Sequence, residues 1–163
     1  MKVYLLRHGI AQDPVHTLPD ELRPLTTKGI KRTRTVVRGM RAIGCHPKRV
    51  VSSPLIRAWQ TAEIARDILA KKSEIEDSAL LSAESAPAQT AAWLARQPEA
   101  DMLLVGHMPN LSRLAALLLS GQDGAWLALR KSGACAIEFE AAPAPASGLL
   151  LWLMEPEQLA DLD

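Results

Sequence analysis

Short apolar runs alternate along this chain with longer stretches in which hydrophobic residues recur at helical spacing. An apolar run of four to eight residues that ends at a turn signal is typical of a buried strand. Residues 2–6, 49–52 and 102–105 have this pattern, and residues 134–140 and 149–154 predict two more strands in the last third of the chain. A further short strand is predicted near residues 79–81.

Four helices are predicted between these strands, over residues 26–43, 54–71, 87–97 and 109–120. Thr26 or Thr27 is a suitable N-cap for the first, and Gly44 is a suitable residue to end it. Ser53 and Pro54 predict the start of the second, with serine as the N-cap and proline at the first helical position. Strands that alternate with helices and are followed by a strand pair predict an α/β fold, a three-layer α/β/α sandwich with a mostly parallel mixed sheet.

Composition favours one globular unit that spans residues 1–163. Apolar residues make up 48% and charged residues 23% of the chain, and the net charge is only +1, which argues against nucleic-acid and membrane-surface partners. The two cysteines are too few for a disulfide framework and lie in no zinc-binding spacing. With no recognisable signal peptide or spanning segment, we expect a cytoplasmic protein.

Three predicted strand ends carry groups that suit phosphate. Arg7, His8 and Gly9 follow the first strand, Ser53 and Arg57 follow the second, and His107 follows the strand at residues 102–105. A neutral imidazole can attack phosphorus, and a guanidinium presents a fork of donors that matches phosphate oxygens. Taken singly, Arg57 is more simply a solvated arginine and His107 an ordinary hydrogen-bonded histidine. Because ligands of α/β sheets lie beyond the carboxyl ends of parallel strands, the three together predict an anion site.

Two other phosphatase chemistries are excluded by spacing. A cysteine-dependent phosphatase loop needs an arginine six residues after its cysteine, but Val51 and Ala141 stand at those positions. A two-metal phosphatase needs clustered ligands, and the four histidines show no short ligand spacing. We therefore expect no metal and no cofactor. The long polar segment 10–25, which contains three prolines, starts at the candidate nucleophile and is expected to be functional.

At this point the motifs resemble a known family. Arg7-His8-Gly9, the segment 53–62 and the segment 106–109 look like the histidine phosphatase superfamily, which has the phosphoglycerate-mutase-like fold. The segment 23–29, together with the short length, is similar to the small SixA-type branch of phosphohistidine phosphatases. The resemblance covers residues 1 to about 115 in the same order.

The resemblance implies a catalytic role for four residues. His8 would be the nucleophile that becomes phosphorylated, Arg7 and Arg57 would bind the phosphoryl oxygens, and His107 would donate to the phosphoryl group. Gly9, Arg23 and Ser53 are expected to contribute to substrate binding, with Arg23 at the border of the pocket.

A general acid is not evident in the chain. Glu84 is the nearest candidate, and Asp13, His16, Asp20 and Glu21 in the long segment are others, although each is more simply a solvated side chain. Because a phosphorylated imidazole leaves readily through its nitrogen, such a substrate depends less on an acid than an alkyl phosphate does.

These observations predict a metal-independent phosphatase that forms a phosphohistidine intermediate on His8 and acts on phosphohistidine in a protein partner. Two alternatives stay open at this point. One is a phosphatase for small phosphoesters, and the other is a phosphate-binding module without turnover.

Overall fold

A single six-stranded sheet organises the chain. The computed structural model describes all residues, Met1 to Asp163, and places the strands in the order β3-β2-β4-β1-β5-β6. Strands β1 to β4 are parallel, β5 runs antiparallel to β1, and β6 runs antiparallel to β5. The strand bounds are β1 Lys2–Arg7, β2 Arg49–Ser52, β3 Ile75–Asp77, β4 Met102–Gly106, β5 Ala134–Glu138 and β6 Leu149–Met154.

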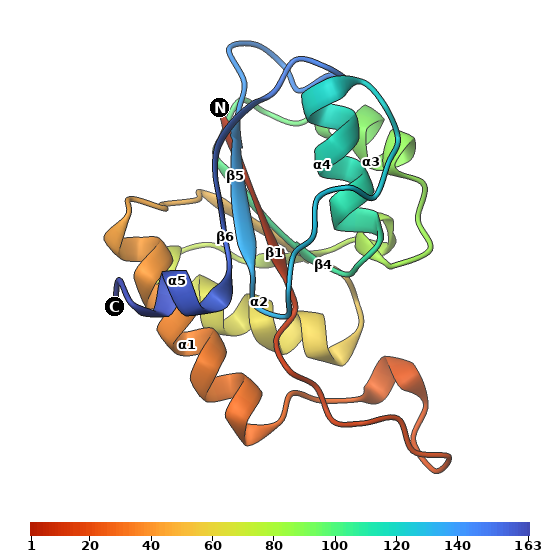
Figure 1. Ribbon diagram of the computed structural model, residues 1–163, viewed down its shortest axis with the longest axis vertical. Coiled ribbons are helices and arrows are strands. Elements are labelled where there is room, and N and C mark those ends of the chain that lie inside the picture. The colour runs from red at the N-terminus through yellow and green to blue at the C-terminus, as the bar shows by residue number, and fades with distance from the viewer.

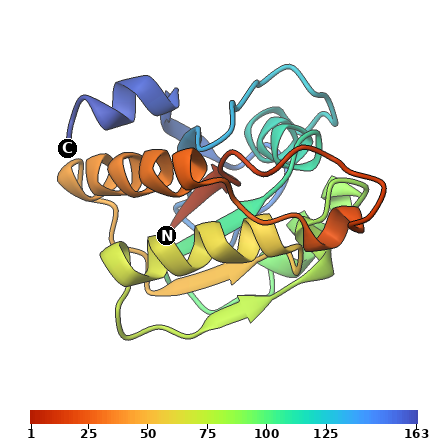
Figure 2. The same cartoon turned by 90° about the horizontal axis from the view of Figure 1, so that it is seen from below.

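Helices cover both faces of this sheet. The helices α1, α2 and α5 lie on one face, and α3 and α4 lie on the other (Figures 1 and 2). The predicted three-layer α/β/α sandwich with a mostly parallel mixed sheet is confirmed. None of the helices combines the length and apolar composition that crossing a bilayer requires. The bounds are α1 Thr27–Ala42, α2 Ile56–Leu69, α3 Pro87–Leu94, α4 Asn110–Ser120 and α5 Pro156–Ala160, with single 3₁₀ turns η1 Asp20–Leu22 and η2 Ala79–Leu81.

The hydrophobic core consists of two clusters, one on each face of the sheet. Along β1, Val3 and Leu5 belong to the cluster under α3 and α4, whereas Tyr4 and Leu6 belong to the cluster under α1 and α2. Successive side chains of a strand point to opposite faces, so a strand covered on both sides must be apolar throughout. This explains why the central strands appear in the sequence as continuous apolar runs.

The start of α1 agrees with the prediction, but the start of α2 does not. Thr26 caps α1 by accepting a hydrogen bond from the backbone N–H of Gly29 at 2.9 Å. Helix α2 begins at Ile56, and Leu55 is its N-cap without a side-chain bond. The predicted capping role of Ser53 is therefore wrong, because its hydroxyl group makes a hydrogen bond to His107 instead.

The strand predicted near residues 79–81 is also wrong, because these residues form η2. The real strand β3 pairs with β2 only as far as the pair Ser52 and Asp77. Beyond Ser52 the chain of β2 turns towards α2, so no backbone is left to pair with residues after Asp77 and Ser78. The five-residue helix α5 was not predicted, because it is too short to show a helical period.

Candidate active site

Two histidines meet at the carboxyl edge of the sheet. Strands β1 and β4 are parallel neighbours, and Arg7 stands opposite Gly106 in their register. The residues that follow, His8 and His107, therefore leave the sheet side by side, with ring centroids 4.9 Å apart and ring planes at 51°. The structure thus brings together the two histidines that the sequence placed about a hundred residues apart.

The backbone determines which nitrogen of His8 carries the proton. Its Nδ1 lies 2.7 Å from the carbonyl oxygen of Gly9. A carbonyl only accepts, so Nδ1 is the donor, and the lone pair of the neutral ring is on Nε2. The pKa of His8 is lowered to about 3, mainly by burial, with the nearby charges of Arg57 and Arg7 acting in the same direction. The hydrogen bond to Gly9 opposes this shift. The ring is therefore neutral near pH 7, with Nε2 able to act as a nucleophile.

Gly9 is required by packing at this strand end. A Cβ atom there would lie 2.5 Å from Oγ1 of Thr33 in α1. The backbone N–H of Gly9 donates to Oγ1 of Thr61 at 3.0 Å, and that hydroxyl donates to the carbonyl of Arg57 at 2.7 Å. The glycine thus lets the residue after the nucleophile fit between α1 and α2, and Thr61 links its position to that of Arg57.

Two guanidinium groups lie near the histidines. Arg7 donates from Nη1 to the carbonyl of Leu129 at 2.9 Å, and Arg57 donates from Nη1 to the carbonyl of Asp20 at 2.7 Å. The Nε atoms of both arginines are buried and have no hydrogen-bond partner within the protein. Buried donors without a partner are costly, and donors on two cations suit an oxyanion with several acceptor oxygens.

Ser53 orients His107. Its hydroxyl oxygen lies 2.9 Å from Nε2 of His107 and weakly accepts from the backbone N–H of Leu55 at 3.4 Å. The Ser53 hydroxyl has no other acceptor within hydrogen-bond distance, so we infer that it donates to Nε2 and that the proton of the ring is on Nδ1. The pKa of His107 is lowered to about 4, mainly by burial and then by the charge of Arg57. Whether Ser53 also binds substrate stays a prediction.

Asp20 joins two arginines that the sequence did not connect. One carboxylate oxygen accepts from Nη2 of Arg57 at 2.9 Å, and the other accepts from Nε of Arg23 at 2.7 Å. Arg23 also donates to the carbonyl of Gln12 at 2.5 Å. These bonds hold Arg23 next to the candidate site through Asp20. The hydrogen bond from Arg23 and then that from Arg57 lower the pKa of Asp20, which keeps it ionised and unsuited to the role of general acid.

The other candidate acids are exposed. Glu84 lies between η2 and α3, in a segment that Asn110 holds through the two N–H donors of its side-chain amide, which are shared among the carbonyls of Leu80, Ser82 and Ser85. Its proposed role as general acid stays a prediction. Asp13, His16 and Glu21 are exposed in the long segment before α1.

A turn before β5 supports the site, and the sequence did not single it out. Ser132 has a φ of 67°, and its backbone N–H lies 3.2 Å from the carbonyl oxygens of both Arg7 and His8. Its side chain contacts the hydroxyl of Thr33 at 3.1 Å. A non-glycine residue in the left-handed region is uncommon and is held there by its surroundings. The Ser132-Gly133 pair was the one sequence signal of a tight turn.

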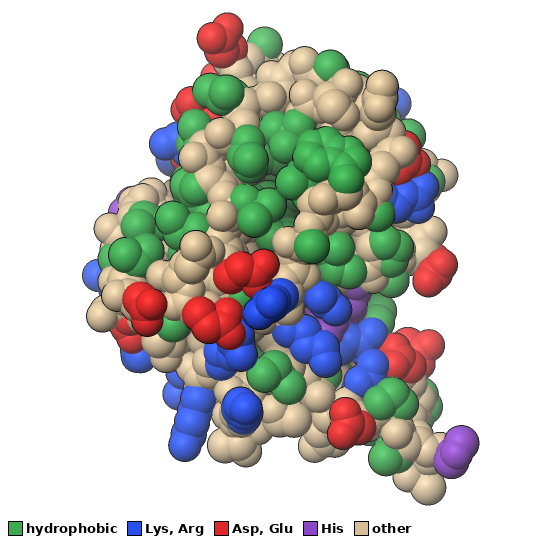
Figure 3. Space-filling model, viewed as in Figure 1, with side chains coloured by type: hydrophobic (Ala, Val, Ile, Leu, Met, Phe, Trp, Pro, Cys, Tyr) green, Lys and Arg blue, Asp and Glu red, His purple; other side chains and the backbone are tan.

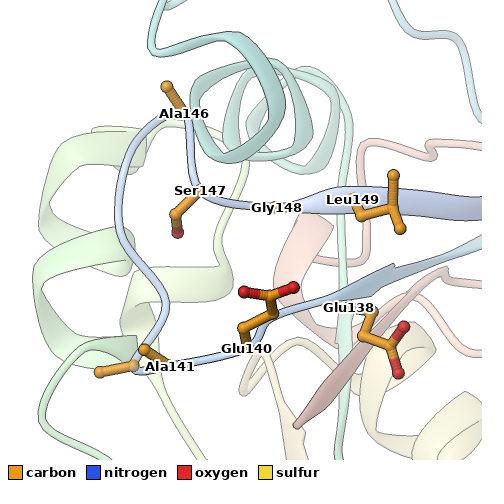
Figure 4. Close-up of a pocket in the computed structure, with 8 residues that line it drawn as sticks. Glu138, Glu140, Ala141, Ala146, Ser147, Gly148 and Leu149 are labelled. Carbon is orange, nitrogen blue, oxygen red and sulfur yellow. The ribbon is translucent and has the colours of Figure 1, made fainter.

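A hollow lies at the opposite end of the sheet from the two histidines. It has a volume of about 360 Å³ and is lined by residues around the end of β5 and the start of β6, including Glu138, Glu140 and Ser147 (Figure 4). In the strand register Glu138 stands opposite Lys2, at the start of β1, whereas His8 follows the other end of β1. Because two carboxylates line it, this hollow is unsuited to a phosphate.

Comparisons with known proteins agree with the site. A sequence model of the histidine phosphatase superfamily, branch 1, matches residues 3–81. Phosphohistidine phosphatase SixA of Escherichia coli is 30% identical over 125 residues, which are 75% of this chain and 76% of that protein. An uncharacterised protein of Picosynechococcus is 39% identical over 137 residues, 82% of each chain. The chain therefore belongs to the histidine phosphatase superfamily.

The structural comparison places it more narrowly. The structure of the protein histidine phosphatase SixA complexed with tungstate superposes with a TM-score of 0.86 and 27% identity, covering 98% of this chain and 99% of that one. Within the superfamily the chain thus falls in the SixA-type branch, and it is a phosphatase of the hydrolase class.

Proposed function

We propose that this phosphatase removes the phosphoryl group from phosphohistidine in a protein partner, through a covalent intermediate on His8. The proposal rests above all on one observation. The hydrogen bond from Nδ1 of His8 to the Gly9 carbonyl leaves an uncharged Nε2 as the nucleophile, next to two arginines with unpartnered Nε donors.

In the first step, the lone pair of His8 Nε2 attacks phosphorus. A new P–N bond forms, the P–N bond of the substrate breaks, and its electron pair returns to the leaving imidazole nitrogen. When the substrate ring carries a proton on its other nitrogen, it departs as neutral imidazole without an acid from the enzyme. This fits a site in which Asp20 is ionised and Glu84 is exposed.

Charge in the transition state is stabilised by fixed donors. Arg7 and Arg57 would each present Nε to the phosphoryl oxygens, and His107 would donate from Nδ1. A loose phosphoryl-transfer transition state is accelerated chiefly by alignment and by such donors, so no metal is required by this chemistry. Tungstate is a tetrahedral oxyanion like phosphate, and the structure of SixA complexed with tungstate supports the binding of such an oxyanion by a protein of this fold.

In the second step, water attacks the phosphorus of phosphorylated His8. Its P–N bond breaks, the electron pair returns to Nε2, and inorganic phosphate is released carrying the oxygen and both protons of the water. The hydrogen bond to Gly9 keeps the ring in place through both steps, so the same nitrogen is regenerated for the next turnover.

The test compares two substrates in parallel. Wild type and His8→Ala are offered a histidine-phosphorylated peptide and p-nitrophenyl phosphate, and phosphate release is measured. We expect turnover of the peptide with a much higher kcat/KM than that of the ester, and no turnover by the variant. Preference for the ester would favour a small-molecule phosphatase, and bound phosphate without turnover of either substrate would favour a binding module.

A further inference from the structure

A cationic hollow is formed by segments that adjoin candidate active-site residues in the chain. It has a volume of about 360 Å³ and is lined by Ile10, Arg32, Arg130, Lys131 and Glu157. Ile10 follows His8 and Gly9 in the chain. Arg130 and Lys131 stand between Leu129, whose carbonyl binds Arg7, and Ser132, whose N–H binds the backbone at His8. The hollow and the site thus share their supporting segments.

Two cations of this hollow are available to a ligand. Arg32 is paired with Glu157, and both belong to the wall. Arg130 is held only loosely, by Glu155 at 3.4 Å, and 72% of its side chain is exposed. Lys131 is exposed and makes no ion pair. Figure 3 shows Lys and Arg side chains gathered around the histidine surface at the centre of this face.

The position of the hollow indicates what it would contact. A small phosphoester carries its charge on the phosphoryl group, which the arginines of the site would bind. The hollow adjoins Gly9 in the chain but contains none of the four candidate catalytic residues, so we expect it to contact residues next to a phosphohistidine rather than the phosphoryl group itself. With a net charge of only +1, the chain has no general attraction for polyanions, so an exposed lysine and a loosely paired arginine at one place suit a few carboxylates.

We propose that Arg130 and Lys131 form a docking surface for acidic side chains that flank the phosphohistidine of the partner protein. This inference rests on the proposed function and adds to it the chemical character of the substrate surface. Exposed charges act mainly on encounter and on specificity, and salt screens them, so the effect should appear in KM and kcat/KM at low ionic strength.

The test uses three probes and a matched pair of double variants. The probes are free phosphohistidine, a phosphohistidine peptide with glutamates on both sides, and the same peptide with lysines in their place. The variants are R130E/K131E and K71E/K72E. Lys71 and Lys72 are exposed after α2, at the end of that helix away from Arg57, and both doubles change the charge equally.

We expect wild type and K71E/K72E to prefer the glutamate peptide by about tenfold in kcat/KM, and R130E/K131E to lose or invert that preference. The preference should shrink in 1 M NaCl, where the Debye length is about 3 Å. Turnover of free phosphohistidine should be the same in all three proteins, which also shows that R130E/K131E is folded.

Other outcomes overturn the inference. Equal turnover of the two peptides by wild type, or an equal loss of preference in both doubles, would refute a docking role. If R130E/K131E and R130Q/K131Q both lose as much kcat/KM on free phosphohistidine as on the glutamate peptide, these residues act on the active site instead. Failure of wild type on all three probes would refute the proposed function itself.

Discussion

Ser53→Ala is the substitution that tests how the second histidine is held. The hydroxyl of Ser53 is fully buried and lies 2.9 Å from Nε2 of His107. Removing it leaves that ring nitrogen without its donor and removes the contact that keeps the proton on Nδ1. No charged group is deleted, so the folded structure should persist.

The expected loss follows from this single bond. A typical hydrogen bond contributes about 1 kcal/mol, and a buried acceptor left without its partner costs about 1–3 kcal/mol. If about 1–2 kcal/mol is lost from the transition state, kcat/KM for a phosphohistidine peptide falls about 5- to 30-fold. The fall should be mainly in kcat, because the donation by His107 matters most as charge moves in the transition state.

The matched control is Ser52→Ala. Ser52 is the preceding residue and is equally buried, but its hydroxyl donates to the backbone carbonyl of Ser53 at 2.9 Å. We expect this variant to retain most of the wild-type kcat. The second readout is ¹⁵N NMR of His107, which distinguishes a proton on Nδ1 from one on Nε2. Wild-type kcat in Ser53→Ala, with the ring proton still on Nδ1, would refute the inferred role of Ser53.

Three further predictions concern the surroundings of the nucleophile. Asp20→Asn removes the charge that bridges two guanidiniums. Because solvent screens this exposed carboxylate, we expect KM to rise only about fivefold. A lower KM would mean that the carboxylate competes with phosphate. Gly9→Ala puts a Cβ 2.5 Å from the hydroxyl oxygen of Thr33 and should lower the free energy of unfolding by about 1–3 kcal/mol in urea titrations. Thr33→Ala in the same chain should recover part of that loss, and no recovery would contradict the steric explanation. The folded-state pKa values of His8 and His107, about 3 and about 4, lie below their ordinary 6.5, so below pH 6.5 the unfolded chain binds protons that the folded one does not. The free energy of unfolding should therefore decrease as the pH is lowered from about 6.5 to 4, by about 1.4 kcal/mol per pH unit for each ring. A free energy of unfolding that does not change over this range would contradict the buried neutral state.

The residues that the sequence could place are those at the ends of parallel strands. His8, Arg57 and His107 each follow a strand that is recognisable by its apolar run, and the rule that such strand ends share one edge of the sheet is general. Their tertiary partners could not be predicted in the same way. Ser53 was assigned to a helix cap because a serine before Pro-Leu suits that local role, but the nearby imidazole is a better partner for its hydroxyl.

Residues in irregular segments were predicted least well. Asp20 lies in the short turn η1, in a segment without hydrophobic periodicity, so nothing in the sequence indicated that its carboxylate would reach both Arg57 and Arg23. The left-handed backbone of Ser132 depends on the carbonyls of Arg7 and His8, which lie more than a hundred residues earlier. The strand near residues 79–81 was predicted from its apolar side chains alone, and Leu81 is buried there in η2 rather than in the sheet.

The proposed catalytic cycle is tested most directly by trapping the phosphoenzyme. Wild type is mixed with a phosphohistidine peptide, quenched rapidly in alkali, digested, and analysed by mass spectrometry and by chromatography that separates the two phosphohistidine isomers. Because Nδ1 of His8 is bound to the Gly9 carbonyl, we predict one phosphoryl group on His8, at Nε2, and none in His8→Ala. Phosphate at Nδ1, on another residue, or equally present in the variant would contradict His8 as the nucleophile.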